Sequence, residues 1–231
     1  MNNNSQSQNT EWRTYDWVKL LGTALLALLF LICLFRSGHL GSNAVSGVAT
    51  AAMSDKFQIN TPSSGLNIPG GSFSLTGTGK PGDLFNLFED GVSLGNVKVG
   101  ADGNWSKLIP SPAQGDHVYQ VSGAMGEQAS LSLNVGAATA VANCDSAFQF
   151  SVDDGSLVSQ PFRFGGIGAA KGYVVTVLRG SKVIGTKEIP LSSTCDWSYR
   201  SSPGKGDVTY EVREIGQEAG NPLSRVTLSV Q

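Results

Sequence analysis

Two cysteines in the C-terminal half are the residues whose type and spacing best suit covalent chemistry. Cys144 and Cys195 fall within one candidate domain, whereas Cys33 lies in a long apolar segment. A pair confined to one domain suggests a disulfide, which forms in an oxidising compartment. Closing a loop of about fifty residues would contribute roughly 4 kcal/mol in the chain-entropy model. The alternative is two unrelated small buried residues, and we expect the disulfide.

A glycine-rich segment offers the pattern of a nucleotide-binding loop. Residues 77–82 (GTGKPG) match G-x-G-x-x-G. A dinucleotide site requires a helix N-terminus directly after the glycines, facing the pyrophosphate. The following residues 83–88 (DLFNLF) are strand-like, and Pro81 has no amide hydrogen to donate. We therefore expect a loop between strands and no cofactor.

The histidines and loop carboxylates provide weak signals for catalysis or metal binding. His39 and His117 are the only histidines, and no G-x-S-x-G motif accompanies them. We expect no catalytic residues, and His117 to be a half-exposed strand residue. Glu89, Asp90 and Asp102 could join a Ca²⁺ site, but such a site needs six to eight oxygens. Solvated turns are the expectation, with no bound metal.

Composition limits the class of protein further. The 231 residues are 40% hydrophobic and 15% charged, with 29 glycines. The glycine content opposes a coiled coil, and the apolar content opposes general disorder. A net charge of −2 and a pI near 5.7 disfavour a nucleic-acid partner that is held by phosphate neutralisation. A small-molecule ligand is disfavoured as well.

An apolar segment near the N-terminus predicts a transmembrane helix. Residues 20–35 contain no charge, and starting the helix at Trp17 brings its length close to the roughly 30 Å of a bilayer core. Lys19 would then extend outward to the interface. Trp12 and Trp17 suit one membrane interface, and Arg36 suits the other.

Two other interpretations of this segment are a cleaved signal peptide and a buried soluble helix. The best cleavage site, residues 49–51, lies far beyond the apolar run, which favours an uncleaved anchor. Arg13 and Lys19, against Arg36 alone on the other side, favour residues 1–19 as a short cytoplasmic tail, and the extracytoplasmic character of the chain after residue 56 favours it more strongly. Residues 36–56, rich in Gly, Ser and Ala, predict a flexible tether between the bilayer and a periplasmic or extracellular part.

The rest of the chain repeats itself. Several aromatic landmarks return after about 90 residues: Phe57-Gln58-Ile59 as Phe148-Gln149-Phe150, Phe73 as Phe162, Trp105-Ser106 as Trp197-Ser198, and Tyr119 as Tyr210. One fold therefore occurs twice, over residues 57–135 and 144–231, with residues 136–143 as a connector.

Both copies have the alternating hydrophobicity of β-strands. Phe73/Leu75 and Tyr119/Val121 are examples, and Asp90-Gly91 and Asp102-Gly103 are turn pairs of the hairpin type. Short strands with frequent turn signals predict an all-β chain of two antiparallel sandwiches. The repeated aromatic residues are the expected core anchors: Phe73, Trp105, Tyr119, Phe162, Trp197 and Tyr210.

The first copy resembles a bacterial immunoglobulin-like domain. The resemblance rests on the glycine-rich residues 77–82, on Glu89-Asp90-Gly91, on residues 101–106 (ADGNWS) and on Gly115-Asp116 with Tyr119. It implies tandem immunoglobulin-like sandwiches and a core tryptophan. The second copy departs at residues 179–182 (RGSK) and at Thr194-Cys195-Asp196, so its assignment rests partly on the repeat. The resemblance implies little about function, because such modules occur in many surface proteins.

These features together predict a non-catalytic protein of the bacterial cell envelope. A single membrane helix with its N-terminus in the cytoplasm would display two sandwiches as a binding or spacer module, with the bilayer and a protein as partners. One alternative is an accessory subunit of a larger inner-membrane complex, and another is a scaffold for peptidoglycan. Residues 57–135 hold six acids and three bases, and residues 144–231 hold nine of each, so the second copy is a candidate partner surface or simply a solvated exterior.

Overall fold

The computed structural model describes residues 57–124 and 126–231, all within one compact unit. In these two ranges no helix is both long and apolar enough to cross a membrane. Several features expected from the sequence lie outside the described residues: the tail 1–19, the membrane helix 20–35 or 17–35, the tether 36–56, and the interface residues Trp12, Trp17, Lys19 and Arg36.

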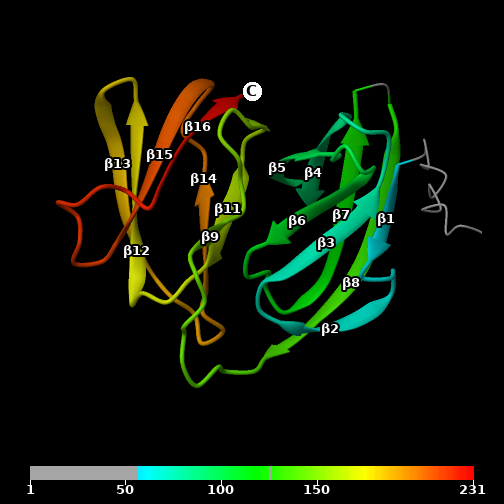
Figure 1. The fold of residues 1–231 in the computed structure, drawn as a ribbon, viewed down its shortest axis with the longest axis horizontal. Helices are drawn as coiled ribbons and strands as arrows, with labels where there is room; N and C mark the ends of the chain where they lie inside the picture. Colours follow the sequence, from blue (N-terminus) through cyan, green and yellow to red (C-terminus); the bar gives the residue numbers. More distant parts are fainter. Residues whose placement is uncertain (1–56, 125) are drawn as a thin grey trace, which may run out of the picture. The chain divides into compact units, whose positions relative to one another are not determined.

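The first repeat consists of two β-sheets (Figure 1). One sheet has the order β1-β3-β6, formed by Gln58–Thr61, Phe73–Thr78 and Asn104–Ile109. The other has the order β2-β8-β7-β4-β5, formed by Leu66–Gly70, Gln128–Ala138, Gly115–Gly123, Leu84–Glu89 and Val92–Lys98. Strand β8 thus extends three residues into the expected connector.

The second repeat has the same arrangement. Strands β9, β11 and β14 pair in that order and are formed by Gln149–Phe150, Phe162–Ile167 and Asp196–Ser201. The other sheet has the order β10-β16-β15-β12-β13, formed by Leu157–Val158, Ser224–Val230, Gly206–Glu214, Gly172–Arg179 and Lys182–Pro190.

Each of the eight strands of one repeat therefore has a counterpart in the other. A three-stranded sheet facing a sheet of four main strands, with a short first strand divided between them, is the order of immunoglobulin- and fibronectin type III-like sandwiches. The predicted all-β class and the tandem sandwiches are confirmed. The prediction of antiparallel sandwiches holds for the other strand pairs within each repeat but is wrong for two, because β2 pairs with β8 and β10 with β16 in parallel. Alternating hydrophobicity does not reveal strand direction.

The repeated aromatic residues lie in two cores. Trp105 and Tyr119 are buried in the first, and Phe162, Trp197 and Tyr210 are buried in the second. Phe73 is only partly buried and packs edge-on against Tyr119. The second core is richer in aromatic residues, because Phe148, Phe150 and Phe164 surround Trp197.

Glycines opposite the tryptophans explain the glycine-rich segment. Gly77 pairs with Trp105, and Gly166 pairs with Trp197. A Cβ atom at Gly77 would lie 2.5 Å from the Trp105 indole and 2.0 Å from the carbonyl oxygen of Gln58. The glycine is therefore required where the indole crosses the strand. Packing against Trp105 thus accounts for the first glycine of the G-x-G pattern.

One of the two expected hairpin turns is a different connection. Asp90 and Gly91 have φ angles of 49° and 78° and join the adjacent strands β4 and β5, as a two-residue hairpin requires. Asp102-Gly103 instead lies between β5 and β6, which belong to opposite sheets of the sandwich. The same turn residues serve both connections, so the sequence alone did not separate them.

A candidate functional site: the junction of the repeats and an uncharged sheet face

The predicted disulfide is present. Cys144 and Cys195 are bonded, with their Cα atoms 5.3 Å apart. Cys195 has a φ of 63°, and Gly103 has a φ of 78° at the corresponding place two residues before Trp105. A left-handed residue thus precedes the core tryptophan in both repeats, but the second repeat uses a cysteine for it. Because such bonds persist in oxidising compartments, the disulfide indicates an extracytoplasmic location for these repeats.

The second repeat is built into an edge of the first. Strand β11 pairs in parallel with β5, with Phe162 opposite Ser93. The amide of Ser93 donates a hydrogen bond to the Pro161 carbonyl at 3.2 Å. The Asn96 side-chain oxygen accepts a bond of 2.7 Å from the amide of Leu157. The edge strand of the first sandwich is therefore contacted by backbone of the second at Ser93 and Asn96, which protects this part of the edge.

A buried carboxylate lies at the centre of this junction. Glu89 faces the interior at the position where the second repeat has Val177, each opposite the core tyrosine of its repeat. Tyr119 donates to it a hydrogen bond of 2.7 Å, and Arg163 of the second repeat forms an ion pair with it. Burial, followed by the nearby Glu89 charge, raises the pKa of the Tyr119 hydroxyl. The expectation of a solvated Glu89 is wrong.

Arg163 connects this carboxylate to the main chain of the first repeat. Its guanidinium also donates to the carbonyls of Pro110 and Ser111. Its side chain is 12% exposed, and that of Glu89 is 8% exposed. A charge removed from water to this degree requires compensating partners. Glu89 has Arg163 and the Tyr119 hydroxyl, and Arg163 has Glu89 and two main-chain carbonyls of the first repeat.

His117 stabilises the β4–β5 turn beside the ion pair. Its Nδ1 lies 2.7 Å from an Asp90 carboxylate oxygen, and its Nε2 lies 2.8 Å from the Ala113 carbonyl oxygen. Both partners are acceptors, so both contacts are hydrogen bonds only when each ring nitrogen has its proton. The side chain is buried, which corrects the expectation of a half-exposed residue. Its local sequence gave no sign of the Asp90 contact, 27 residues away.

A second contact between the repeats is centred on Asp196. This carboxylate is fully buried at the start of β14 and accepts a bond of 2.7 Å from the amide of Ser72 in the first repeat. Ser192 and Thr194 donate to it from within the second repeat. Burial alone would raise the Asp196 pKa, but these hydrogen bonds outweigh it and lower the pKa. The ionised carboxylate thus connects the two sandwiches.

Lys107 is a buried lysine at the junction, and it should make stability depend on pH. Its ammonium donates a bond of 3.1 Å to the Asn96 carbonyl, and burial lowers its pKa from 10.5 to about 8, against an opposing attraction to Asp153. The unfolded chain therefore binds more protons than the folded chain between pH 8 and 10.5. We expect the free energy of unfolding to rise across that range by roughly 3 kcal/mol.

Urea unfolding of the Lys107→Met variant between pH 7 and 9.5 tests this expectation. Removing the buried amine should abolish the rise, whereas the matched control Lys98→Met, which changes an exposed lysine, should retain it. The upper limit avoids ionising Tyr210, whose pKa burial raises to about 12, and the unfolded tyrosines near pH 10. An equal pH dependence in both variants would show that Lys107 is not the responsible group.

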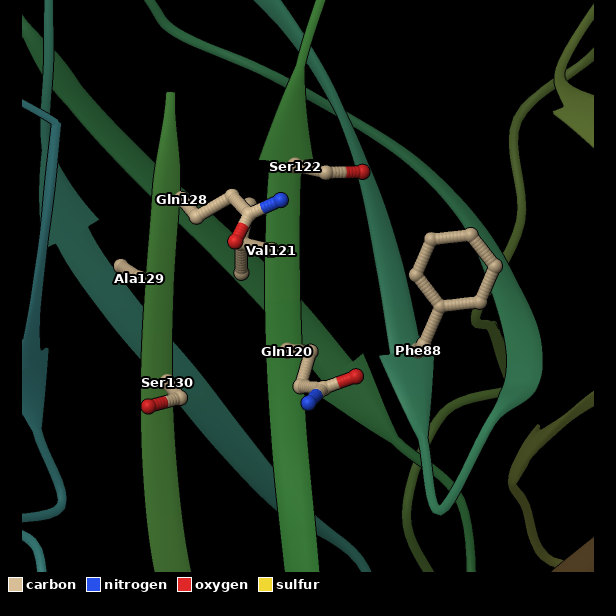
Figure 2. A pocket seen from close by; sticks show the side chains of 7 residues that line it. All are labelled: Phe88, Gln120, Val121, Ser122, Gln128, Ala129 and Ser130. Carbon is tan, nitrogen blue, oxygen red and sulfur yellow. The ribbon is translucent and has the colours of Figure 1, made fainter. Parts of the chain in front are cut away.

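The outer face of β4, β7 and β8 forms an uncharged hollow of about 440 Å³ (Figure 2). Figure 2 shows the ring of Phe88 on β4 beside Gln120 and Ser122 of β7, with Gln128 and Ser130 on β8 beyond them. Strand register explains the grouping, because Gln120 lies opposite both Phe88 and Ser130, and Ser122 lies opposite Gln128. We call these five residues the Phe88 face. Phe88 and Ser122 are half-buried, and the others are exposed.

The same rows of the second repeat have a different chemistry. Aligning Tyr119 with Tyr210 places Glu211, Arg213 and Arg225 at the positions of Gln120, Ser122 and Ser130. Glu211 forms ion pairs with Arg213 at 2.8 Å and with Arg225 at 3.3 Å. The charged side chains of the second repeat are thus engaged in ion pairs with one another. The amides and hydroxyls of the Phe88 face are left facing solvent.

Sequence reasoning identified the disulfide and the aromatic core but missed the Glu89–Arg163 pair, buried Lys107 and the Phe88 face. One signal was available for Glu89 and for the face. When the two repeats are aligned strand by strand, Glu89 corresponds to Val177 of the second repeat. Gln120 and Ser130 correspond to the charged residues Glu211 and Arg225. The expected core anchors and cysteines are not brought together in one functional site. The cysteines and the anchors of the second repeat belong to its sandwich.

No protein-family model matches the chain, and no curated protein is significantly similar to it. The chain is similar to the fibronectin(III)-like modules of CbhA from Clostridium thermocellum, with 12% identity over 75% of this chain and 92% of that chain and a TM-score of 0.28. It is also similar to β-glucuronidase 3 of Bacteroides uniformis, with 13% identity over 77% of this chain and a TM-score of 0.29.

A third similarity is to the BSP domain of a biofilm associated protein, with 16% identity over 76% of this chain and a TM-score of 0.24. The chain spans 25% of the length of the β-glucuronidase and 29% of the biofilm protein. Similarities this weak carry no information about ligand or activity. The assignment as immunoglobulin- and fibronectin type III-like sandwiches rests on the strand order of each repeat.

Proposed function

We propose that this protein is a non-catalytic binding and spacer protein of the bacterial cell envelope. Its two sandwiches act outside the cytoplasm as one stiff unit, held at the membrane by an uncleaved helix within residues 17–35. The observation that supports it most is the junction, where β11 pairs with β5 and Arg163 forms an ion pair with the buried Glu89.

A stiff junction is what distinguishes a spacer from two independently moving modules. Domains joined only by a linker move relative to one another by default. Here the repeats share strand pairing, the Ser72–Asp196 bond and the Asn96–Leu157 bond in addition to the ion pair. Three of the buried charged groups, Glu89, Lys107 and Asp196, take part in these contacts or lie beside them. The burial of these three groups therefore follows from the packing of the two repeats against each other.

Distance measurement between spin labels tests the stiffness. In the full chain with Cys33→Ser, labels at the exposed strand positions Ser132→Cys and Thr186→Cys report on the two repeats. We expect one narrow distance distribution. Labels at Ser132→Cys and Lys98→Cys, both in the first repeat, give the width that the labels themselves contribute. A distribution between repeats much broader than this control would reject the spacer role.

The membrane anchor has a separate test. Membranes prepared from cells that express the full chain are extracted with alkaline carbonate, and the N-terminus of the retained protein is sequenced. We expect the protein to remain in the membrane with residues 17–35 intact. We also expect protease added to spheroplasts to digest the repeats. A soluble chain beginning near Ala52 would show instead that the segment is a cleaved signal peptide.

A further inference from the structure

We infer that the Phe88 face of the first repeat is a binding site for neutral glycans. This deepens the proposed binding role by naming its ligand class and surface. The site lies on the solvent side of β4, β7 and β8 and has an aromatic ring, two amides and two hydroxyls around a hollow of about 440 Å³.

Phe88 supplies the apolar contact that such a ligand needs. Its ring is half-buried but lies on the outer face, opposite Gln120 and Ser93, and is not part of either core cluster. The negative face of an aromatic ring attracts weakly positive C–H groups. The C–H groups on one side of a pyranose ring provide such a surface. An aliphatic residue would not make this contact equally well.

The surrounding side chains match sugar hydroxyls. Gln120 and Gln128 each offer two N–H donors and a carbonyl acceptor, and Ser122 and Ser130 each donate and accept. A sugar hydroxyl likewise donates and accepts. Among the described residues, none of these four side chains forms a hydrogen bond within the protein. In Figure 2, Gln120 and Ser122 lie beside Phe88, and Gln128 and Ser130 lie on the next strand. Their groups are therefore available to a ligand.

The second repeat shows what the same strand positions look like without such a site. Its Glu211–Arg213–Arg225 ion pairs occupy the corresponding rows, and Thr176 lies in place of Phe88. No member of the Phe88 face is charged, so nothing in the hollow would balance a carboxylate or sulfate group on a ligand. An uncharged hydroxyl-rich chain is the ligand that this combination favours over an acidic polysaccharide.

Titration of the full chain with defined oligosaccharides tests the inference. The probes are hexamers of glucose, mannose and N-acetylglucosamine, with a galacturonic acid hexamer as the charged comparison. Binding is measured by calorimetry and by saturation transfer from aromatic protons to sugar C–H protons. We expect at least one neutral hexamer to bind and the acidic one to bind at least about tenfold more weakly.

Three variants locate the binding. Phe88→Ala should weaken it at least about tenfold and abolish the saturation transfer. The triple variant Gln120→Glu, Ser122→Arg, Ser130→Arg installs the ion pairs of the second repeat and should abolish binding while the protein stays folded. Val118→Ala, which changes an exposed apolar residue of β7 outside the hollow, is the matched control and should leave the affinity unchanged.

Failure of all neutral hexamers to bind at millimolar concentration would overturn the inference, as would binding that survives both Phe88→Ala and the triple variant. The spin-label distances report on the spacer role independently of any ligand, so a narrow distribution with no glycan binding would reject the ligand class alone. Recovery of a protein partner that the triple variant loses, without glycan binding, would assign the face to that partner instead.

Discussion

Replacement of Arg163 by methionine is expected to lower the free energy of unfolding by about 3–5 kcal/mol, because it leaves the Glu89 carboxylate buried without its counter-charge. The Pro110 and Ser111 carbonyls lose their donor in the same change. Urea unfolding of the full chain at pH 7 measures the loss. The spin-label distribution between the repeats should broaden in this variant, because the same guanidinium joins them.

Two further variants separate the ion pair from a general effect of losing arginine. Arg179→Met removes an exposed arginine that also donates to main-chain carbonyls, those of Pro203 and Lys205, and we expect it to lose less than about 1 kcal/mol. Glu89→Leu combined with Arg163→Met removes both charges and should be more stable than Arg163→Met alone. Additive single effects in this double-mutant cycle would show that the two residues do not interact.

Removal of the disulfide is the second large effect. Cys144→Ser with Cys195→Ser should lower the free energy of unfolding by about 4 kcal/mol, because the unfolded chain regains the freedom of a loop of 51 residues. Calorimetric unfolding in the absence of reductant measures the difference. The same pair of substitutions should leave intact the label distance within the first repeat, which contains neither cysteine.

The left-handed backbone at position 195 provides an internal control. Cys144→Ser with Cys195→Gly should recover roughly 1 kcal/mol relative to the double serine variant, because glycine adopts a φ of 63° without a steric penalty. The first repeat already has Gly103 at this place. If the double serine and serine–glycine variants were equally stable, backbone strain at this position would be negligible.

Local features of the sequence were sufficient for the fold of each repeat. The alternation of Tyr119 and Val121, or of Leu131 and Leu133, identifies a strand with one buried face, because successive side chains point to opposite sides. Recurrence of the aromatic residues after about 90 positions identified the second copy, including Trp197 in its changed surroundings. Strand direction and the path of the Asp102-Gly103 turn were beyond this reasoning, since neither leaves a local pattern.

The candidate sites were less accessible from the sequence. Glu89 directly precedes a turn pair and has the sequence context of a solvated carboxylate, although it is buried. Its partner Arg163 is 74 positions away in the other repeat. The residues of the Phe88 face are ordinary strand residues, and three strands must align in register before Gln120 lies between Phe88 and Ser130.

The sequence by itself determined the two sandwiches, their aromatic cores and the cysteine pair, because hydrophobic alternation, turn chemistry and an internal repeat act over short distances along the chain. Only the tertiary structure decided that the second repeat contacts the edge strand of the first and supplies Arg163 to its buried carboxylate. It also decided that five uncharged residues share one hollow. The physical reason is that a buried charge or a shared surface depends on which distant strands become neighbours.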